Sequence, residues 1–390
     1  MGFFSGRVSC SRFRLLSSTT QGSAEDLLQK LQERVIGTQR FMTSDGIESG
    51  WLAGDHILDT KFDLQKNIVN DTIQFALRID QQKIPSDLIR AYTQVELEGL
   101  AAENPSGNPS TRQKREAKQL ALDKLEQEAA DGRFLKRKMF PVLWDTVSNE
   151  LLVATTSLTA IERLHALFQE TFEIGFEPLT AGRQAFLLAE ARQLTRGVDD
   201  ASPSAFIPGV TPQDFAWSMD ETRKDFLGNE FLMWLWFTVE CGDDVITLAD
   251  DSELSVMLTR TLVLECPRGE TGKETITSDA PTKLAEARRA IQVGKLPRKL
   301  GMILSRHDQQ YDLTFQAESL AITGAKLPAP EADQERARHE ERVDQLRHLL
   351  ETIDLLFDRF NSLRVTDQWP KQLSRIQTWL QEEKRPRMSA

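Results

Sequence analysis

Residues 132–155 read GRFLKRKMFPVLWDTVSNELLVAT, and they mark the place where the chain changes from helix to sheet. Met139 to Trp144 and Leu151 to Thr155 are apolar runs joined by a turn at Ser148-Asn149, so the sequence predicts a β-hairpin. The segment just before, Arg112 to Ala130, has a helical composition but few large apolar residues. A helix with so narrow an apolar stripe packs against little, and we therefore expect it to project from the body.

Other segments carry local signals of the same kind. Helices are expected at Ala24 to Glu33, from Ser86 as N-cap to Leu100, at Ala160 to Phe172, at Pro281 to Val293 before Gly294, from Val343 to Phe360, and from Leu373 to Leu380. Strands are expected at Ile73 to Ile79, Val245 to Leu248, Leu254 to Leu264, Gly301 to Leu304 and Tyr311 to Ala317. Residues 196–230 hold several glycines and prolines and are expected to be irregular.

These elements predict an α+β fold of antiparallel sheets with packed helices and a projecting helical finger. The chain of 390 residues is long enough for two or three lobes. We divide it into four segments. They are an N-terminal α+β region (1–104), a finger helix with the hairpin and its helix (105–180), a central α+β region with expanded loops (181–327) and a C-terminal helical region (328–390).

The first 24 residues allow two interpretations. Arg7, Arg12 and Arg14 with several serines and no acid before Glu25 are typical of a targeting peptide. Val8, Cys10 and Phe13 are interleaved with polar residues, although imperfectly in phase, which is typical of an amphipathic strand. We favour the strand, because the segment has no apolar core and no cleavage-like site.

The motifs that would indicate an enzyme are incomplete. Pro267 to Glu274 resembles a phosphate-binding loop, but Pro267 stands where the loop needs glycine and Glu274 where it needs Ser or Thr. A polar surface loop is the better interpretation. The acid pairs Asp243-Asp244 and Asp250-Asp251 flank turns and are expected to be solvated. We therefore expect no catalytic residues and no enzyme.

Metal, cofactor and membrane signals are also weak. The thiols Cys10, Cys241 and Cys266 are widely spaced, and the five histidines are scattered, so we expect no metal site and no cofactor. The longest apolar run, Phe231 to Val239, is shorter than the roughly 20 residues that a spanning helix needs. We therefore expect no membrane partner.

The charge of the chain is distributed unevenly. With 48 Lys+Arg against 59 Asp+Glu the net charge is -11, which taken alone argues against binding to nucleic acid. Between residues 112 and 138, however, nine basic residues stand against five acids. Such a cluster can bind phosphates without reading bases. The candidates for contact with double-stranded DNA are Arg112, Lys114, Arg115, Lys118, Arg133, Lys136, Arg137 and Lys138.

A second basic cluster follows the helix that ends near Val293. Its candidates are Lys295, Arg298 and Lys299, with Arg288 and Arg289 just before them. Each cluster also has a plain alternative, since solvated helix faces and helix C-termini commonly carry cations. Two such clusters on an acidic chain make the nucleic-acid hypothesis the stronger one.

The order of these segments resembles the recombination-associated RdgC family of bacterial DNA-binding proteins. The similar segments span about three quarters of the chain, and it is their order that carries the resemblance. They are Gly2-Phe3-Phe4, Gly50-Trp51, Arg78 to Ser86 with Ile89-Arg90, Arg112 to Lys118, Arg133-Phe134, Trp144-Asp145-Thr146, Leu151-Leu152-Val153, Glu177-Pro178-Leu179, the helix 284–293 with Gly294-Lys295, and the strand from Leu300.

The resemblance implies a cytoplasmic, nucleoid-associated protein that forms a ring-shaped homodimer. Such a ring would encircle duplex DNA without sequence preference and limit strand exchange by the recombinase, a further partner. The family's finger carries an aromatic residue near its tip that meets the symmetry mate, and Phe134 is the matching position.

The chain also departs from the family pattern. Segments 196–240 and 265–281 look expanded, and Ser278-Asp279-Ala280-Pro281 occupies the place of an expected basic patch. The alternative hypothesis is a structural or protein-interaction module with no nucleic-acid role. It would dimerise through the amphipathic helices of residues 334–380.

Overall fold

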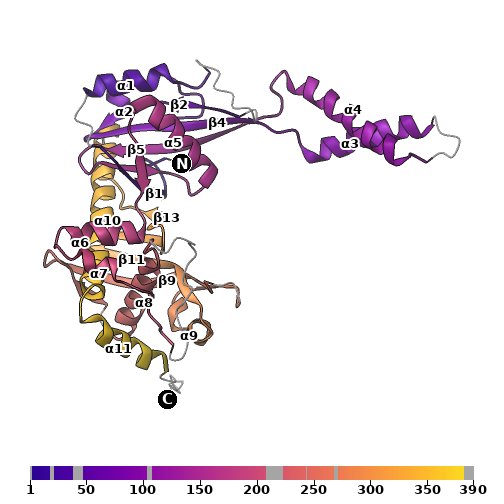
Figure 1. The fold of residues 1–390 in the computed structure, drawn as a ribbon. Helices are drawn as coiled ribbons and strands as arrows, with labels where there is room; N and C mark the ends of the chain where they lie inside the picture. Colours follow the sequence, from indigo (N-terminus) through magenta and orange to yellow (C-terminus); the bar gives the residue numbers. More distant parts are fainter. Residues whose placement is uncertain are drawn as a thin grey trace.

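The computed structural model describes residues 2–17, 22–37, 47–102, 108–207, 223–242, 244–267 and 271–381. The predicted class is confirmed, since the chain is an α+β fold built on one large antiparallel sheet with helices packed on it. Figure 1 shows two lobes stacked on each other and a pair of helices that projects from the N-terminal lobe. Among the described residues, no helix is long and apolar enough to cross a membrane.

A single sheet runs through both lobes. Its strands follow the order β10-β9-β11-β12-β13-β1-β6-β5-β4-β2, and β3, β7 and β8 pair with β4, β1 and β9. The bounds are β1 Val8–Leu15, β2 Ile47–Leu52, β3 Ile68–Val69, β4 Thr72–Gln82, β5 Leu135–Asp145, β6 Glu150–Val153, β7 Phe176–Pro178, β8 Val245–Thr247, β9 Glu253–Glu265, β10 Lys273–Ser278, β11 Leu296–Arg306, β12 Gln309–Gln316 and β13 Ile322–Lys326.

Strand β1 joins the two halves of the sheet. Val8 and Cys10 pair with β13 of the C-terminal lobe, whereas Ser11 to Arg14 pair with β6 of the N-terminal lobe. This part of the chain is therefore a strand, as the alternation predicted.

The N-terminal lobe has its core on one face of the sheet. The helices α1 (Ala24–Glu33) and α5 (Leu158–Phe172) cover Trp51, Phe75 and Trp144, all three fully buried. The indole of Trp51 donates a hydrogen bond of 2.8 Å to Thr171 Oγ1 on α5. A short helix, α2 (Leu64–Asn67), contacts β4, β3 and α1 in this lobe.

The C-terminal lobe is organised around α8 (Phe226–Glu240), which is buried on nearly all sides. Gly228 allows this helix to approach the sheet, because a Cβ there would lie 1.9 Å from the carbonyl oxygen of Ala317. The other helices of the lobe are α6 (Ala181–Glu190), α7 (Thr195–Asp199), the 3-10 helix Pro281–Lys283, α9 (Ala285–Gln292) and α11 (Trp369–Gln381).

The long helix α10 (Glu335–Arg364) lies along both lobes (Figure 1). It is bound to β1 by Arg12, whose Nη1 lies 2.6 Å from Asp354 Oδ1, and to β5 by Arg347, whose Nε lies 2.7 Å from Asp145 Oδ2. Arg12 is almost completely buried, so this ion pair is shielded from solvent. The lobes are therefore connected by the sheet and by α10.

Most predicted elements are confirmed, but several observed elements, among them α6 and α8, were not predicted, and some details are wrong. Strand β5 begins at Leu135 rather than Met139, and Ser86 is the first residue of its helix rather than the N-cap. Strand β10 and strand β13 were not predicted. Segment 196–230 is not irregular throughout, because α8 begins at Phe226; residues 208–222 lie outside the described residues.

Candidate nucleic-acid interface

The finger is an antiparallel pair of helices, α3 (Ser86–Ala102) and α4 (Thr111–Ala129). Helix α4 begins with a capping box, in which Ser110 and Gln113 each bind the other's backbone N–H. Its buried residues are mostly small, namely Ala117, Ala121, Leu125 and Ala129, while no residue of α3 is fully buried. The segment boundary drawn at residue 104 falls between these two helices, which pack only as a pair.

Several polar contacts tie the finger helices together, among them a hydrogen bond of 3.2 Å from Gln113 Nε2 to the carbonyl oxygen of Leu100. Tyr92 Oη donates to Glu128 Oε1 at 2.5 Å, and Lys124 Nζ lies 2.5 Å from Glu96 Oε1. The hydrogen bond to Glu128 also raises the pKa of Tyr92. Lys124 is thus paired within the finger, although its side chain stays exposed.

The outer half of α4 is basic, whereas the outer half of α3 carries the acids Glu96 and Glu98. Helix α3 runs away from the sheet and α4 returns to it, so the first turns of α4 lie near the tip (Figure 1). Residues 111–118 hold four basic side chains and one acid, Glu116. All four cations are exposed, and none forms an ion pair with any residue that the structure describes; they are Arg112, Lys114, Arg115 and Lys118.

At the root of the finger, the basic residues 136–138 are divided between the two faces of strand β5. Side chains alternate along β5, so Lys136 and Lys138 share a face with Phe140, whereas Arg137 lies on the opposite face. Arg137 Nε lies 3.7 Å from Asp80 Oδ2, and Asp80 is also bound by Arg78. Lys136 and Lys138 are exposed and without an ion pair among the described residues.

Arg133 is used locally. Its guanidinium lies 2.7 Å from Asp131 Oδ2 and 3.0 Å from Glu128 Oε2. The hydrogen bond from Arg133 lowers the pKa of Asp131, and the same bond raises the pKa of Arg133. Its charge is therefore largely balanced at the end of α4.

The predicted position of Phe134 at the finger tip is wrong. Phe134 follows α4 and precedes β5, and its carbonyl accepts a hydrogen bond of 3.1 Å from Lys83 N. It is therefore at the root, because α4 leads back to the sheet. Residues 103–107 lie outside the described residues.

The second basic cluster is largely neutralised. Lys295 is buried and lies 2.8 Å from Glu274 Oε2, while Arg298 lies 2.8 Å from Glu318 Oε1 and 2.9 Å from Glu265 Oε2. Lys299 is half-buried in β11. The structure thus does not bring this cluster together with the finger, and it holds two of its three cations in ion pairs.

Sequence reasoning missed one exposed cation at the root. Lys83 follows β4 directly and is linked to Phe134 through its backbone N–H. It lies beside the strand that carries Lys136 and Lys138. The sequence position of Lys83 could have indicated this, because a lysine between a predicted strand and the helix start at Pro85-Ser86 must lie at the junction of sheet and finger.

The segments considered for catalysis have structural roles where they are described. Asp250 binds Arg306 at 2.5 Å and Ser252 Oγ at 2.7 Å. Arg268 to Glu270 and Asp243 lie outside the described residues. No group of three or more metal-binding side chains occurs in the described part of the chain. Comparison with protein-family models and with curated proteins gives no match to this chain.

Proposed function

We propose that the chain is a non-catalytic, sequence-independent double-stranded DNA-binding protein that acts as a ring-shaped homodimer. The observation that carries this proposal is the row of exposed cations on the outer half of α4, at Arg112, Arg115 and Lys118 with Lys114 beside them. Their spacing of three residues places them along one side of a helix. Lysine and arginine in such a row bind phosphates and release counterions without reading bases.

The shape of the chain supports the same proposal. The finger extends from one end of the stacked lobes, and α9 lies on the side of the C-terminal lobe toward which the finger points (Figure 1). Arg289 on α9 and Lys283 before it are exposed there. A second copy whose finger met the first would enclose a space between finger and lobes, with these cations at its edge.

The net charge of -11 fits this arrangement. An acidic exterior repels DNA, while exposed cations on the finger attract it, so binding is directed to one surface. A duplex enclosed in this way would be less accessible to a recombinase, which would limit strand exchange without any direct contact with that enzyme.

The alternative of dimerisation through the C-terminal helices finds no supporting surface. The apolar face of α10, with Leu346, Leu350 and Phe357, is buried in the chain's own core, and Ile376 of α11 is buried as well. Side chains used in this way are not available to a partner.

The test is fluorescence anisotropy with two duplexes of unrelated sequence, at several salt concentrations. We expect equal affinities and a steep loss of affinity as salt increases. A ring should also remain on a closed circular duplex after a salt challenge that removes it from linear duplex. Absence of duplex binding at low salt, or a strong preference for one sequence, would show the proposal to be wrong.

A further inference from the structure

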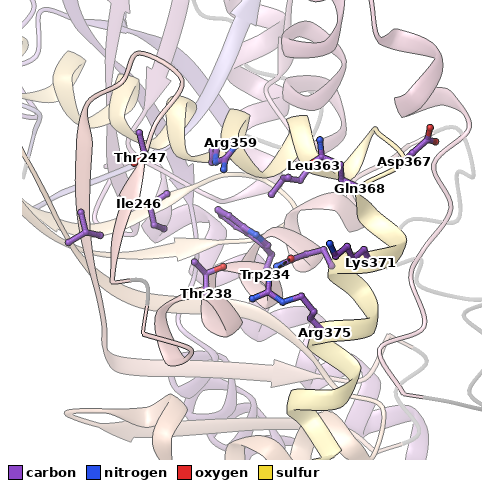
Figure 2. Close-up of a pocket in the computed structure, with 12 residues that line it drawn as sticks. Trp234, Thr238, Ile246, Thr247, Arg359, Leu363, Asp367, Gln368, Lys371 and Arg375 are labelled. Carbon is purple, nitrogen blue, oxygen red and sulfur yellow. Dashed lines mark hydrogen bonds between the residues drawn. The ribbon is translucent and has the colours of Figure 1, made fainter.

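A pocket of about 630 Å³ lies in the C-terminal lobe, far along the chain from the finger. It is lined by α8, β8, the end of α10 and the start of α11 (Figure 2), and it is open to solvent on the side of its charged residues. Its volume falls within the range of about 300–1,000 Å³ that is usual for small-molecule sites.

The floor of the pocket is apolar and well supported. It is formed by Trp234, Ile246 and Leu363, of which Trp234 and Ile246 are buried. The ring of Trp234 packs on Phe360 with 5.8 Å between centroids. Because these rings belong to the core of the lobe, the floor has little freedom to move.

Three cations and one carboxylate line the rest of the pocket. Arg359, Lys371 and Arg375 surround Trp234 in Figure 2, and Asp367 is the only acid in the lining. None of the three cations forms an ion pair with a carboxylate in the portion of the chain that the structure covers. Their local excess of two positive charges opposes the net charge of the chain.

Contacts within the pocket fix the position of one of its cations. Arg375 Nη1 lies 3.3 Å from Gln372 Oε1, and its guanidinium lies 5.6 Å from the ring centre of Phe237. Lys371 and Arg375 are four residues apart on α11, so both side chains leave the same face of the helix. Further hydrogen-bonding side chains are supplied by Gln368, Thr238 and Thr247.

We propose that this pocket binds a phosphorylated organic ligand of nucleotide size. Its phosphates would lie between Arg375, Lys371 and Arg359, and its planar part would rest on the apolar floor. Asp367 is placed to accept a hydrogen bond from a hydroxyl or amino group of the ligand. An inorganic phosphate alone would leave most of the pocket empty, and cations grouped around one cavity suit a compact ligand better than an extended strand. This site is independent of the proposed DNA-binding finger.

The first experiment is titration calorimetry of the full chain at low salt with ADP, adenosine and pyrophosphate as probes. We expect ADP to bind at least about tenfold more tightly than either of the others, since only ADP contacts both cations and floor. If pyrophosphate or adenosine binds as tightly as ADP, the proposal is wrong. It is also wrong if no probe binds at about 1 mM, which is on the order of the weakest useful affinity.

The second experiment locates the site. Arg375→Gln and Lys371→Gln should each weaken ADP binding about tenfold, because each removes one charge-assisted contact. Arg196→Gln is the matched control, since Arg196 is an exposed arginine of the same lobe outside the pocket, and it should bind ADP like the wild type. Unchanged ADP binding in the pocket variants would overturn the proposal.

Two further outcomes separate this site from the finger. A finger variant, Arg112→Gln with Arg115→Gln, should bind ADP normally. If it loses ADP binding instead, the phosphates bind at the finger and the pocket proposal is wrong. If Arg375→Gln weakens binding of a short duplex but not of ADP, the pocket is a DNA contact, which also overturns it.

Discussion

The two basic clusters look alike in sequence and differ completely in the fold. On the outer half of α4 the cations point into solvent and have no ion pair among the described residues. In β11 and just before it, Lys295 and Arg298 are held by Glu274, Glu265 and Glu318. The first cluster has unpaired charge for a ligand, whereas two of the three cations in the second are neutralised within the fold. A run of cations therefore predicts binding only when nothing in the fold neutralises it.

The finger and the body also differ in what holds them together. The finger is stabilised by a narrow stripe of small residues on α4, a capping box at Ser110 and a few polar contacts. The C-terminal lobe is built on a large apolar core and buried ion pairs. Changes at the finger surface should therefore affect binding, and changes in the body should affect stability.

The largest expected effect comes from removing the finger cations together. Replacing Arg112, Lys114, Arg115 and Lys118 by Gln should lower duplex affinity by about 10²-fold, because up to four phosphate contacts per chain are lost. The salt dependence of log K should become shallower by about 0.9 for each lost contact. Anisotropy titrations at several salt concentrations measure both, and an unchanged Tm shows that the finger is still folded. If the variant binds duplex DNA as tightly as the wild type, the cations of α4 do not contact DNA, and the two clusters do not differ in this respect.

The second effect is a loss of stability in the other cluster. Arg298→Gln should lower the free energy of unfolding by about 2 kcal/mol, because Glu318 would be left without its charged partner. Urea unfolding measures this change. Lys299→Gln, at the next residue, is the control and should shift stability by less than about 0.5 kcal/mol. A large loss of DNA affinity in Arg298→Gln without any loss of stability would contradict this assignment.

A smaller effect tests the alternation along β5. Replacing Lys136 and Lys138 by Gln should weaken duplex binding several-fold, whereas Arg137→Gln should have less effect, because Arg137 is already near Asp80. Gel-shift titrations measure the duplex affinity of the two variants. If Arg137→Gln is the more damaging change, the DNA contacts lie on the opposite face of the strand.

The smallest expected effect is a pH dependence of stability that arises from His348, which lies outside the finger. Burial, with help from Arg306, lowers the pKa of His348 below its ordinary value of 6.5. The unfolded chain therefore binds this proton more readily than the folded chain, and stability should fall as the pH falls below about 6.5. Between pH 7.5 and pH 5.5 the free energy of unfolding should fall less in His348→Gln than in the wild type. The difference between the two falls should be less than about 1 kcal/mol in urea unfolding. An identical pH profile in both proteins would refute the assignment.

The sequence by itself determined the elements that depend on near neighbours. The helix Ala24–Glu33 was predicted at its observed bounds, because apolar spacing and capping residues act within a few positions. The hairpin after the finger was predicted with its turn in the right place, although β5 begins four residues earlier than expected. The projection of α4 also followed from its composition. Helix α8 was not recognised, since a helix that is apolar on all sides has no amphipathic period to detect.

Only the tertiary structure decided which cations are available. The partners Glu318 and Glu265 of Arg298 lie 20 and 33 positions away in the chain, and no local pattern links them. The family resemblance implies a tip position for Phe134, but the returning direction of α4 puts this residue at the root of the finger. The pocket beside Trp234 joins segments more than 100 positions apart. Charge along a sequence is local, whereas neutralisation depends on distances that only the folded chain fixes.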